Sequence, residues 1–399
     1  MSQTPDLSDP IVVVGSARTA MGGFQGALAP ATATELGATA IQAALARAGV
    51  APEAIDEAIM GCVLPAGLGQ APARQAALGA ELGEGVPCTT LNKMCGSGMK
   101  AVMVAMDQLR AGNGSCVVAG GMESMTNAPY LLPRMRSGAR LGHAQALDHM
   151  FLDGLEDAYD KGRLMGTFAE DCAEHYQFTR EDQDGYAIRS LECALTAQRE
   201  GRLSAEITPV ALTTRKGAVT IAEDEQPQSA RPDKIPTLKP AFRKDGTVTP
   251  ANASSISDGA AALVLMRQSE AEAQGLTPKA RLLAHASHAQ APGWFTTAPV
   301  PAMRKVLERL GWSVEDVDLW EINEAFAVVP MAAERELGIP RERLNVNGGA
   351  CALGHPIGAS GARILVTLLH ALEHAGARRG IASLCIGGGE GTAIGLEML

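Results

Sequence analysis

The feature that most constrains the fold is a pattern that occurs twice, once in the first third of the chain and once in the last. In the first copy, a glycine-rich turn at 92–98 precedes a helix-like run and a strand-like stretch that ends in glycines. In the second, a turn at 345–361 precedes an apolar helix pattern and the strand-like run 381–386, which enters three glycines. Alternating strands and helices indicate a parallel α/β sheet. The repetition predicts two duplicated halves whose turns face one site.

Local signals place further elements along the chain. The continuous apolar run 11–14 is typical of a strand buried on both faces. Thr32 and Glu35 form a capping box, which predicts a helix that ends at Gly49. Another helix is expected over 180–199, because a threonine precedes it as N-cap and a glycine follows its end.

The regular pattern breaks between about residues 127 and 250, where prolines, glycines and charged residues are frequent. Structureless loops of this length are rare in compact domains, so we expect an inserted, lid-like subdomain. The chain is therefore divided into an N-terminal domain over 1–275, which contains this insertion, and a C-terminal domain over 276–399.

Composition excludes several classes of protein. The 399 residues carry a net charge of −10, which argues against a nucleic-acid or anionic-membrane partner. The first ten residues are polar and acidic, and no apolar run approaches the roughly 20 residues that span a bilayer. The eight cysteines include no C-x-x-C pair and no zinc spacing, so no metal is expected. We predict a cytoplasmic protein with free thiols.

Cys95 lies between a strand-like run and the start of a helix, with glycines at 96 and 98. The unpaired N–H groups and dipole of a helix N-terminus favour a thiolate, so we predict a nucleophile with a depressed pKa. The alternative is a buried structural cysteine.

The same stretch matches the dinucleotide fingerprint G-x-G-x-x-A, with Glu123 as the ribose acid. A nicotinamide-dependent dehydrogenase is therefore a second hypothesis.

Three further residues lie at turns or strand ends. His355, flanked by a glycine and a proline, is the best candidate for a general base. Cys385 ends an apolar strand and opens onto glycines whose N–H groups can bind an anion. Asn323 follows a strand-like run and can orient water, donate to an oxyanion or cap a helix. Together these groups suit acyl transfer to Cys95 coupled to proton abstraction from a carbon acid.

The motifs at 92–98, 323–326, 347–361 and 385–391, in this order, resemble those of the thiolase family over nearly the whole chain. The resemblance implies an α/β, five-layer α-β-α-β-α fold from two similar halves, with the insertion covering coenzyme A. It implies an acyltransferase of fatty-acid metabolism that condenses two acetyl-CoA to acetoacetyl-CoA and CoA, or thiolyses 3-ketoacyl-CoA, through an acyl thioester on Cys95. Coenzyme A and acetyl-CoA are then substrates, with no permanent cofactor. A homo-oligomer, dimer or tetramer, is expected.

Matching positions also imply roles. His355 would activate Cys95 and, with a water held by Asn323, form one oxyanion hole. The backbone N–H groups of Cys95 and Gly387 would form the second, where each donor can contribute about 3–4 kcal/mol. Cys385 would move the proton at the α-carbon.

Substrate contacts follow from the same matching. Ser254 would bond the pantetheine chain and Met165 would line the acyl pocket. Arg231 and Lys234 are candidates for the adenine end of coenzyme A.

The chain also departs from the family pattern. Glu390 stands where an uncharged residue is expected, and a carboxylate close to Cys385 would raise the pKa of that thiol. Ala251 and Ser255 replace glycines, and Leu164 stands where several short-chain members carry histidine. Because of Leu164, the sequence does not determine the preferred acyl chain length. A broad-chain degradative 3-ketoacyl-CoA thiolase is therefore an alternative. A non-catalytic acyl-CoA or lipid carrier on the same fold is another.

Overall fold

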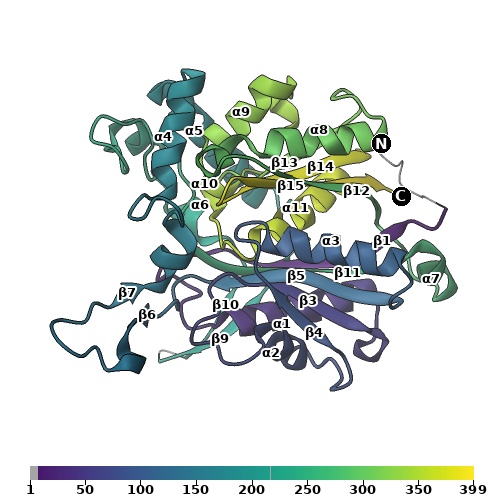
Figure 1. Cartoon of the computed structure of the whole chain (residues 1–399). Helices are drawn as coiled ribbons and strands as arrows, with labels where there is room; N and C mark the ends of the chain where they lie inside the picture. Colours follow the sequence, from purple (N-terminus) through teal and green to yellow (C-terminus); the bar gives the residue numbers. More distant parts are fainter. Residues whose placement is uncertain (1–7, 216) are drawn as a thin grey trace.

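The computed structural model describes residues 8–215 and 217–399 (Figure 1). The strands are β1 (Ile11–Thr19), β2 (Gly22–Gly23), β3 (Glu57–Gly61), β4 (Cys88–Leu91), β5 (Cys116–Ser124), β6 (Tyr130–Leu131), β7 (Leu147–Asp148), β8 (Ile207–Thr208), β9 (Val210–Thr214), β10 (Gly217–Ile221), β11 (Ser257–Arg267), β12 (Ala280–Ala289), β13 (Leu319–Ile322), β14 (Arg379–Ile386) and β15 (Glu390–Met398). The α-helices are α1 (Ala33–Ala48), α2 (Pro72–Gly79), α3 (Ser97–Arg110), α4 (Met165–Tyr176), α5 (Arg180–Arg199), α6 (Glu225–Ser229), α7 (Gln268–Ala273), α8 (Pro299–Leu310), α9 (Val328–Leu337), α10 (Ala350–Leu353) and α11 (Ser360–Ala375).

The elements form stacked layers of helices and strands, as Figure 1 shows. Helices α1 and α2 cover one face of the strands β1, β11, β5, β3 and β4, and α3 and α11 pack together on the other face. Strands β12 to β15 lie above this central pair, and α8 and α9 cover their outer face. Both groups of strands belong to one eleven-stranded sheet, because β1 pairs with β12 and joins the halves.

The sheet is mixed, so the prediction of a parallel sheet is wrong in part. Strand β3 is parallel to β4 and β5, and β13 is parallel to β14, as alternating strands and helices require. In contrast, β11 is antiparallel to β5 and β1, and β15 is antiparallel to β14 and β12. The tight glycine turn between β14 and β15 can join only antiparallel strands.

Local sequence signals fix several element ends as predicted. Helix α1 begins after Thr32, whose side chain and that of Glu35 form the capping box, and its C-cap is Gly49 at φ 67°. Helix α5 has the predicted bounds, with a capping box at Thr179. Every residue of β1 is buried, as a strand covered on both faces requires.

The segment between β5 and β11 leaves the sheet and returns to it, since these two strands are direct neighbours. It contains the helices α4, α5 and α6 and two small hairpins, β6–β7 and β9–β10. The β6–β7 region extends away from the body at the lower left of Figure 1, whereas α4 and α5 stand beside α9. Within the described residues, no helix is both long and apolar enough to cross a membrane.

The N-terminal ends of α3 and α11 touch, and glycines allow this close approach. A Cβ on Gly98 would lie 2.8 Å from the backbone nitrogen of Ala362, and one on Gly361 would lie 2.4 Å from that of Met99. A Cβ on Gly96 would lie 2.5 Å from Ile386 at the end of β14. The glycines of the G-x-G-x-x-A stretch therefore serve packing between the halves, and the two glycine-rich turns meet as the repeat predicts.

Candidate active site

A cavity of about 340 Å³ lies where the two turns meet. Most of its lining is apolar, as is usual for a small-molecule site. Three reactive side chains line it, those of Cys95, His355 and Cys385, together with the backbone of Gly387. The structure thus brings together four of the residues that the sequence singled out, from widely separated segments.

The nucleophile turn is held rigidly ahead of α3. Met94, directly before Cys95, has a left-handed backbone at φ 47°. The Ser97 hydroxyl donates to the Met94 carbonyl at 2.6 Å and accepts from the Lys93 N–H at 2.8 Å, which closes the turn. Side-chain bonds of this kind are a common way to stabilise a helix start.

The predicted depressed pKa of Cys95 is wrong. Withdrawal of the sulfur from water raises the pKa of the Cys95 thiol to about 11. The N–H groups of Gly387 and of Cys95 itself lower this pKa, but by less than burial raises it. The resting nucleophile is therefore a thiol that needs a base. The same two N–H groups are directed at the sulfur, so they can also donate to the oxygen of an acyl group that reacts with Cys95.

His355 is held as a neutral base with a defined tautomer. Its Nδ1 lies 2.6 Å from the Ser360 hydroxyl, which itself donates its single hydrogen to the Pro356 carbonyl at 2.9 Å. Nδ1 must therefore be the protonated nitrogen, which leaves Nε2 free to accept a proton. Burial, and then the positive charge of Arg363, lowers the pKa of His355 to about 3.

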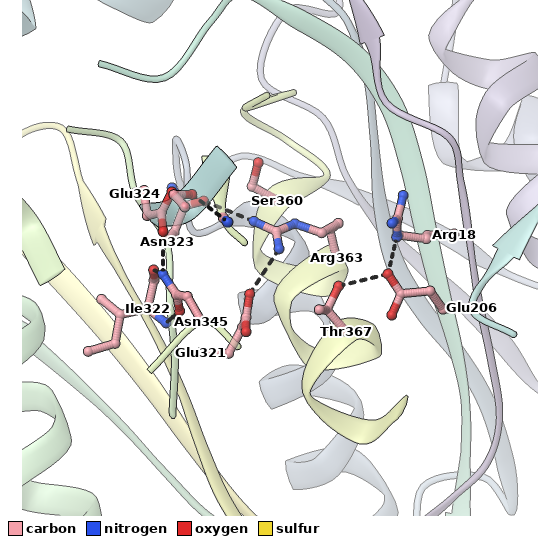
Figure 2. A network of polar contacts seen from close by, with 12 residues as sticks. Arg18, Glu206, Glu321, Ile322, Asn323, Glu324, Asn345, Ser360, Arg363 and Thr367 are labelled. Atoms are coloured by element: carbon pink, nitrogen blue, oxygen red, sulfur yellow. Dashed lines mark hydrogen bonds and ion pairs between the residues drawn. The ribbon is translucent and has the colours of Figure 1, made fainter. Parts of the chain in front are cut away.

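Asn323 lies behind His355 and does not line the cavity. It directly follows β13 and is fully buried. Its Nδ2 is 3.4 Å from Nδ1 and 3.5 Å from Nε2 of His355. These nearly equal distances indicate that the amide packs against the ring instead of pairing with one nitrogen. Figure 2 shows Asn323 within a buried network that includes Glu321, Glu324 and Arg363.

Cys385 ends β14 and is buried beside Cys95. Burial first, and then the negative charge that Cys95 would carry, holds the pKa of the Cys385 thiol well above its usual value. The expected influence of Glu390 is wrong, because Glu390 pairs across the strands with Ile386. Neighbouring residues of a strand point to opposite faces, so Glu390 and Cys385 diverge. The Glu390 carboxylate instead accepts from the Lys93 ammonium group.

The proposed substrate contacts divide into two groups. Ser254 and Met165 line the cavity, with Met165 at the first position of α4. Arg231 and Lys234 are exposed, at the start of the short 3-10 helix η4 (Pro232–Thr237), and neither lines the cavity. Leu164 also lines it.

Two residues that the sequence reading missed support the reactive groups. Ser360, which fixes the tautomer of His355, begins α11 five residues after it. Arg363 is the only charged residue in the apolar first part of α11 (360–372). A lone arginine in an otherwise apolar helix pattern was the available signal, since arginine is almost never fully buried unless it is paired.

Two family models match the chain, the thiolase N-terminal domain over residues 11–269 and the thiolase C-terminal domain over 276–398. The chain belongs to the thiolase family.

An acetyl-CoA acetyltransferase of Cupriavidus necator is 51% identical over 97% of this thiolase and 99% of the relative. A cytosolic acetyl-CoA acetyltransferase of Mus musculus is 48% identical over 97% and 98%. The crystal structure of Acat5 thiolase from Ascaris suum in complex with coenzyme A superposes with a TM-score of 0.93 at 41% identity, covering 98% of this thiolase and 100% of that chain. The expected thiolase fold is confirmed.

Glu123 has a structural place in this thiolase that rules out a role as ribose acid. It is buried in β5, and its carboxylate accepts the backbone N–H groups of Val63, Leu64 and Gly358 at 2.9–3.1 Å. It therefore ties the turn after His355 to the segment after β3. Burial raises the pKa of Glu123 to about 7.

Alkylation of Cys95 in this thiolase should accelerate steadily as the pH rises from about 6 to about 10. The pKa of the thiol is raised to about 11 and that of His355 is lowered to about 3, so a thiolate–imidazolium pair does not form. Iodoacetamide labelling followed by peptide mass spectrometry measures the rate. His355→Ala should show a similar profile, because the neutral ring does not supply the charge. A plateau below about pH 8 would contradict this neutral pair.

Proposed function

We propose that this thiolase reversibly condenses two acetyl-CoA into acetoacetyl-CoA and CoA through an acyl thioester on Cys95. One observation carries the proposal: two thiols and a neutral imidazole converge on one apolar cavity at the junction of the two halves. Hydrolysis would need only one thiol, whereas carbon–carbon chemistry needs a second group that handles a proton at carbon. Relatives named acetyl-CoA acetyltransferase support the substrate class.

In thiolysis, Cys95 attacks the C3 ketone of acetoacetyl-CoA as Nε2 of His355 takes its proton. The developing oxyanion accepts from the N–H groups of Cys95 and Gly387, which already lie at the sulfur. Preorganised donors of this kind are typically the largest single contribution to acyl transfer. The C2–C3 bond then breaks, the acetyl group stays on Cys95, and the electron pair moves to C2 as an enolate.

Cys385 completes the reaction as a proton carrier. Its thiol protonates C2 of the enolate, and acetyl-CoA leaves. The resulting Cys385 thiolate takes the proton of incoming CoA, whose sulfur attacks the acetyl group on Cys95. Cys95 leaves as thiolate and recovers its proton from His355. The enolate oxygen is stabilised by His355 with a water that Asn323 holds. Condensation is the reverse of these steps.

The substrate is held on the side of the cavity formed by the insertion. Met165 lines the acyl end and packs near Gly387, where a Cβ would lie 3.6 Å from its sulfur. Ser254 is the pantetheine contact, since its side chain lines the same cavity. Arg231 and Lys234 stay predictions for the adenine end, as exposed cations at the start of η4.

Cleavage of 3-ketoacyl-CoAs of increasing length tests this function. We expect CoA-dependent cleavage of acetoacetyl-CoA and a kcat/KM at least about 100-fold lower for long chains, because bulky side chains line a cavity of only about 340 Å³. Three of these are Phe151, Leu164 and Phe242. Leu164→Ala, which removes one of these walls, should shift the preference toward longer chains.

Each other outcome of this assay would support a different function for the chain. Comparable activity on long chains would identify a broad degradative thiolase. Stable acylation of Cys95 without cleavage of any substrate would support the acyl-CoA carrier instead.

We also propose a cytoplasmic homo-oligomer, a dimer or a tetramer. The mouse relative is named cytosolic, which supports the compartment. Two features support a second copy of the chain as partner. Strand β4 ends the sheet and is only partly buried. The β6–β7 region exposes apolar side chains, with Leu141 94% and Tyr130 67% exposed.

A further inference from the structure

The segment that carries Asn323 is clamped by two buried glutamates, one on each side of it (Figure 2). Glu324 accepts four hydrogen bonds from other segments: from Tyr186 Oη at 3.1 Å, Ser190 Oγ at 2.7 Å, Asn345 Nδ2 at 2.8 Å and the Cys351 N–H at 3.0 Å. Glu321 instead faces α11, where Arg363 donates to it. These contacts anchor the chain on both sides of Asn323, and its side-chain amide has to be oriented by other groups.

Arg363 has the geometry to orient that amide. Its guanidinium is fully buried; Nη1 donates to Glu321 Oε1 at 3.1 Å and Nη2 to Asn323 Oδ1 at 3.5 Å. Among the described residues, its Nε has no hydrogen-bond partner. A buried ion pair is often no more stabilising than apolar side chains of similar size. An arginine on this buried helix therefore points to a role other than stability.

The chemistry of the two groups decides which way the amide faces. A guanidinium carries only donors, so the amide atom beside it must be the oxygen. The Nδ2 group of Asn323 is then turned to His355, consistent with its distances of 3.4 and 3.5 Å from the ring nitrogens. The flipped amide would set N–H groups against the N–H groups of Arg363 and lose this bond.

We propose that Arg363 is a positioning residue that fixes the Asn323 amide with its nitrogen toward His355. In that orientation the amide donates to the water that, with His355, binds the enolate oxygen, so the inference rests on the proposed function. Glu321 holds the guanidinium in place and balances its charge. Acyl transfer to Cys95 uses the N–H groups of Cys95 and Gly387 as donors and does not need the Asn323 amide.

The test removes the pair together, as Glu321→Gln with Arg363→Met, so that no buried charge is left alone. We expect kcat for condensation to fall about 10- to 100-fold while KM for acetyl-CoA changes less than about twofold. The burst of CoA released on acylation of Cys95 should persist. In an Asn323→Ala background the same two changes should alter kcat less than about twofold, because the amide that they orient is gone.

Arg18 provides a matched control, since it is an equally buried arginine that pairs with Glu206 and Asp224 at 2.6–2.8 Å, outside the cavity. Arg18→Met should lower the unfolding midpoint without a kcat effect that depends on Asn323. Arg363→Lys keeps the charge beside Glu321, and serves if the double variant does not fold; it should show the same dependence on Asn323.

Equal loss of kcat with and without the Asn323 amide would overturn the proposal, and so would full activity of the variants. Failure of the unaltered protein to acylate or condense would instead contradict the proposed function.

Discussion

Replacing Cys95 by serine is expected to lower turnover at least about 1,000-fold while acetoacetyl-CoA still binds. A hydroxyl is far less acidic than a thiol, and the neighbouring base is weak. The pKa of His355 is lowered to about 3 by burial and by Arg363, so the imidazole takes a proton only as the new bond forms. Initial rates of CoA-dependent cleavage, with mass spectrometry of the acyl-enzyme, measure the loss.

Cys193→Ser is the matched control for this experiment. Cys193 is a half-buried thiol on α5 that does not line the cavity, so its replacement should leave turnover within about twofold. If Cys95→Ser keeps more than about a tenth of the activity, Cys95 is not the nucleophile. An acyl group found on another cysteine would lead to the same conclusion.

The sequence predicted those parts of the fold that depend on neighbours in the chain. The ends of α1 follow from Thr32, Glu35 and Gly49, because capping is a local interaction between a side chain and the backbone nearby. Strand direction was not predictable in this way. The apolar pattern of β11 is compatible with parallel or antiparallel partners. The long segment between β5 and β11 also allows either direction, so only the folded sheet shows that the two strands are antiparallel.

The candidate site shows the same division. Cys95, His355 and Cys385 were found because each is a reactive side chain on or beside a glycine-rich turn. Their protonation states were not, since these depend on how segments hundreds of residues apart exclude water from the sulfur and the ring. The expected effect of Glu390 failed for a related reason. Its partner, Lys93, lies 297 residues away, and only the strand register shows which face each side chain takes.

Replacing Cys385 by alanine is expected to separate the two halves of the reaction. Acylation of Cys95 by acetyl-CoA should continue within a few-fold, because the donors at that sulfur are backbone N–H groups of Cys95 and Gly387. Exchange of the α-protons of acetyl-CoA with solvent should fall at least about 1,000-fold, since no other thiol of the described residues lines the cavity. Deuterium incorporation in heavy water, followed by mass spectrometry, measures exchange, and the CoA burst measures acylation.

The control for this change is Cys172→Ala. Cys172 is a buried thiol on α4, close enough to Cys385 to affect its pKa, yet it does not line the cavity. Its loss should leave both exchange and acylation unchanged if the carrier must touch the substrate. If exchange in Cys385→Ala continues at more than about a tenth of the original rate, His355 and not Cys385 would be the group that moves the α-proton. In that case Cys95 would be the only one of the two cavity cysteines that takes part in the reaction, and Cys385 would serve only in packing.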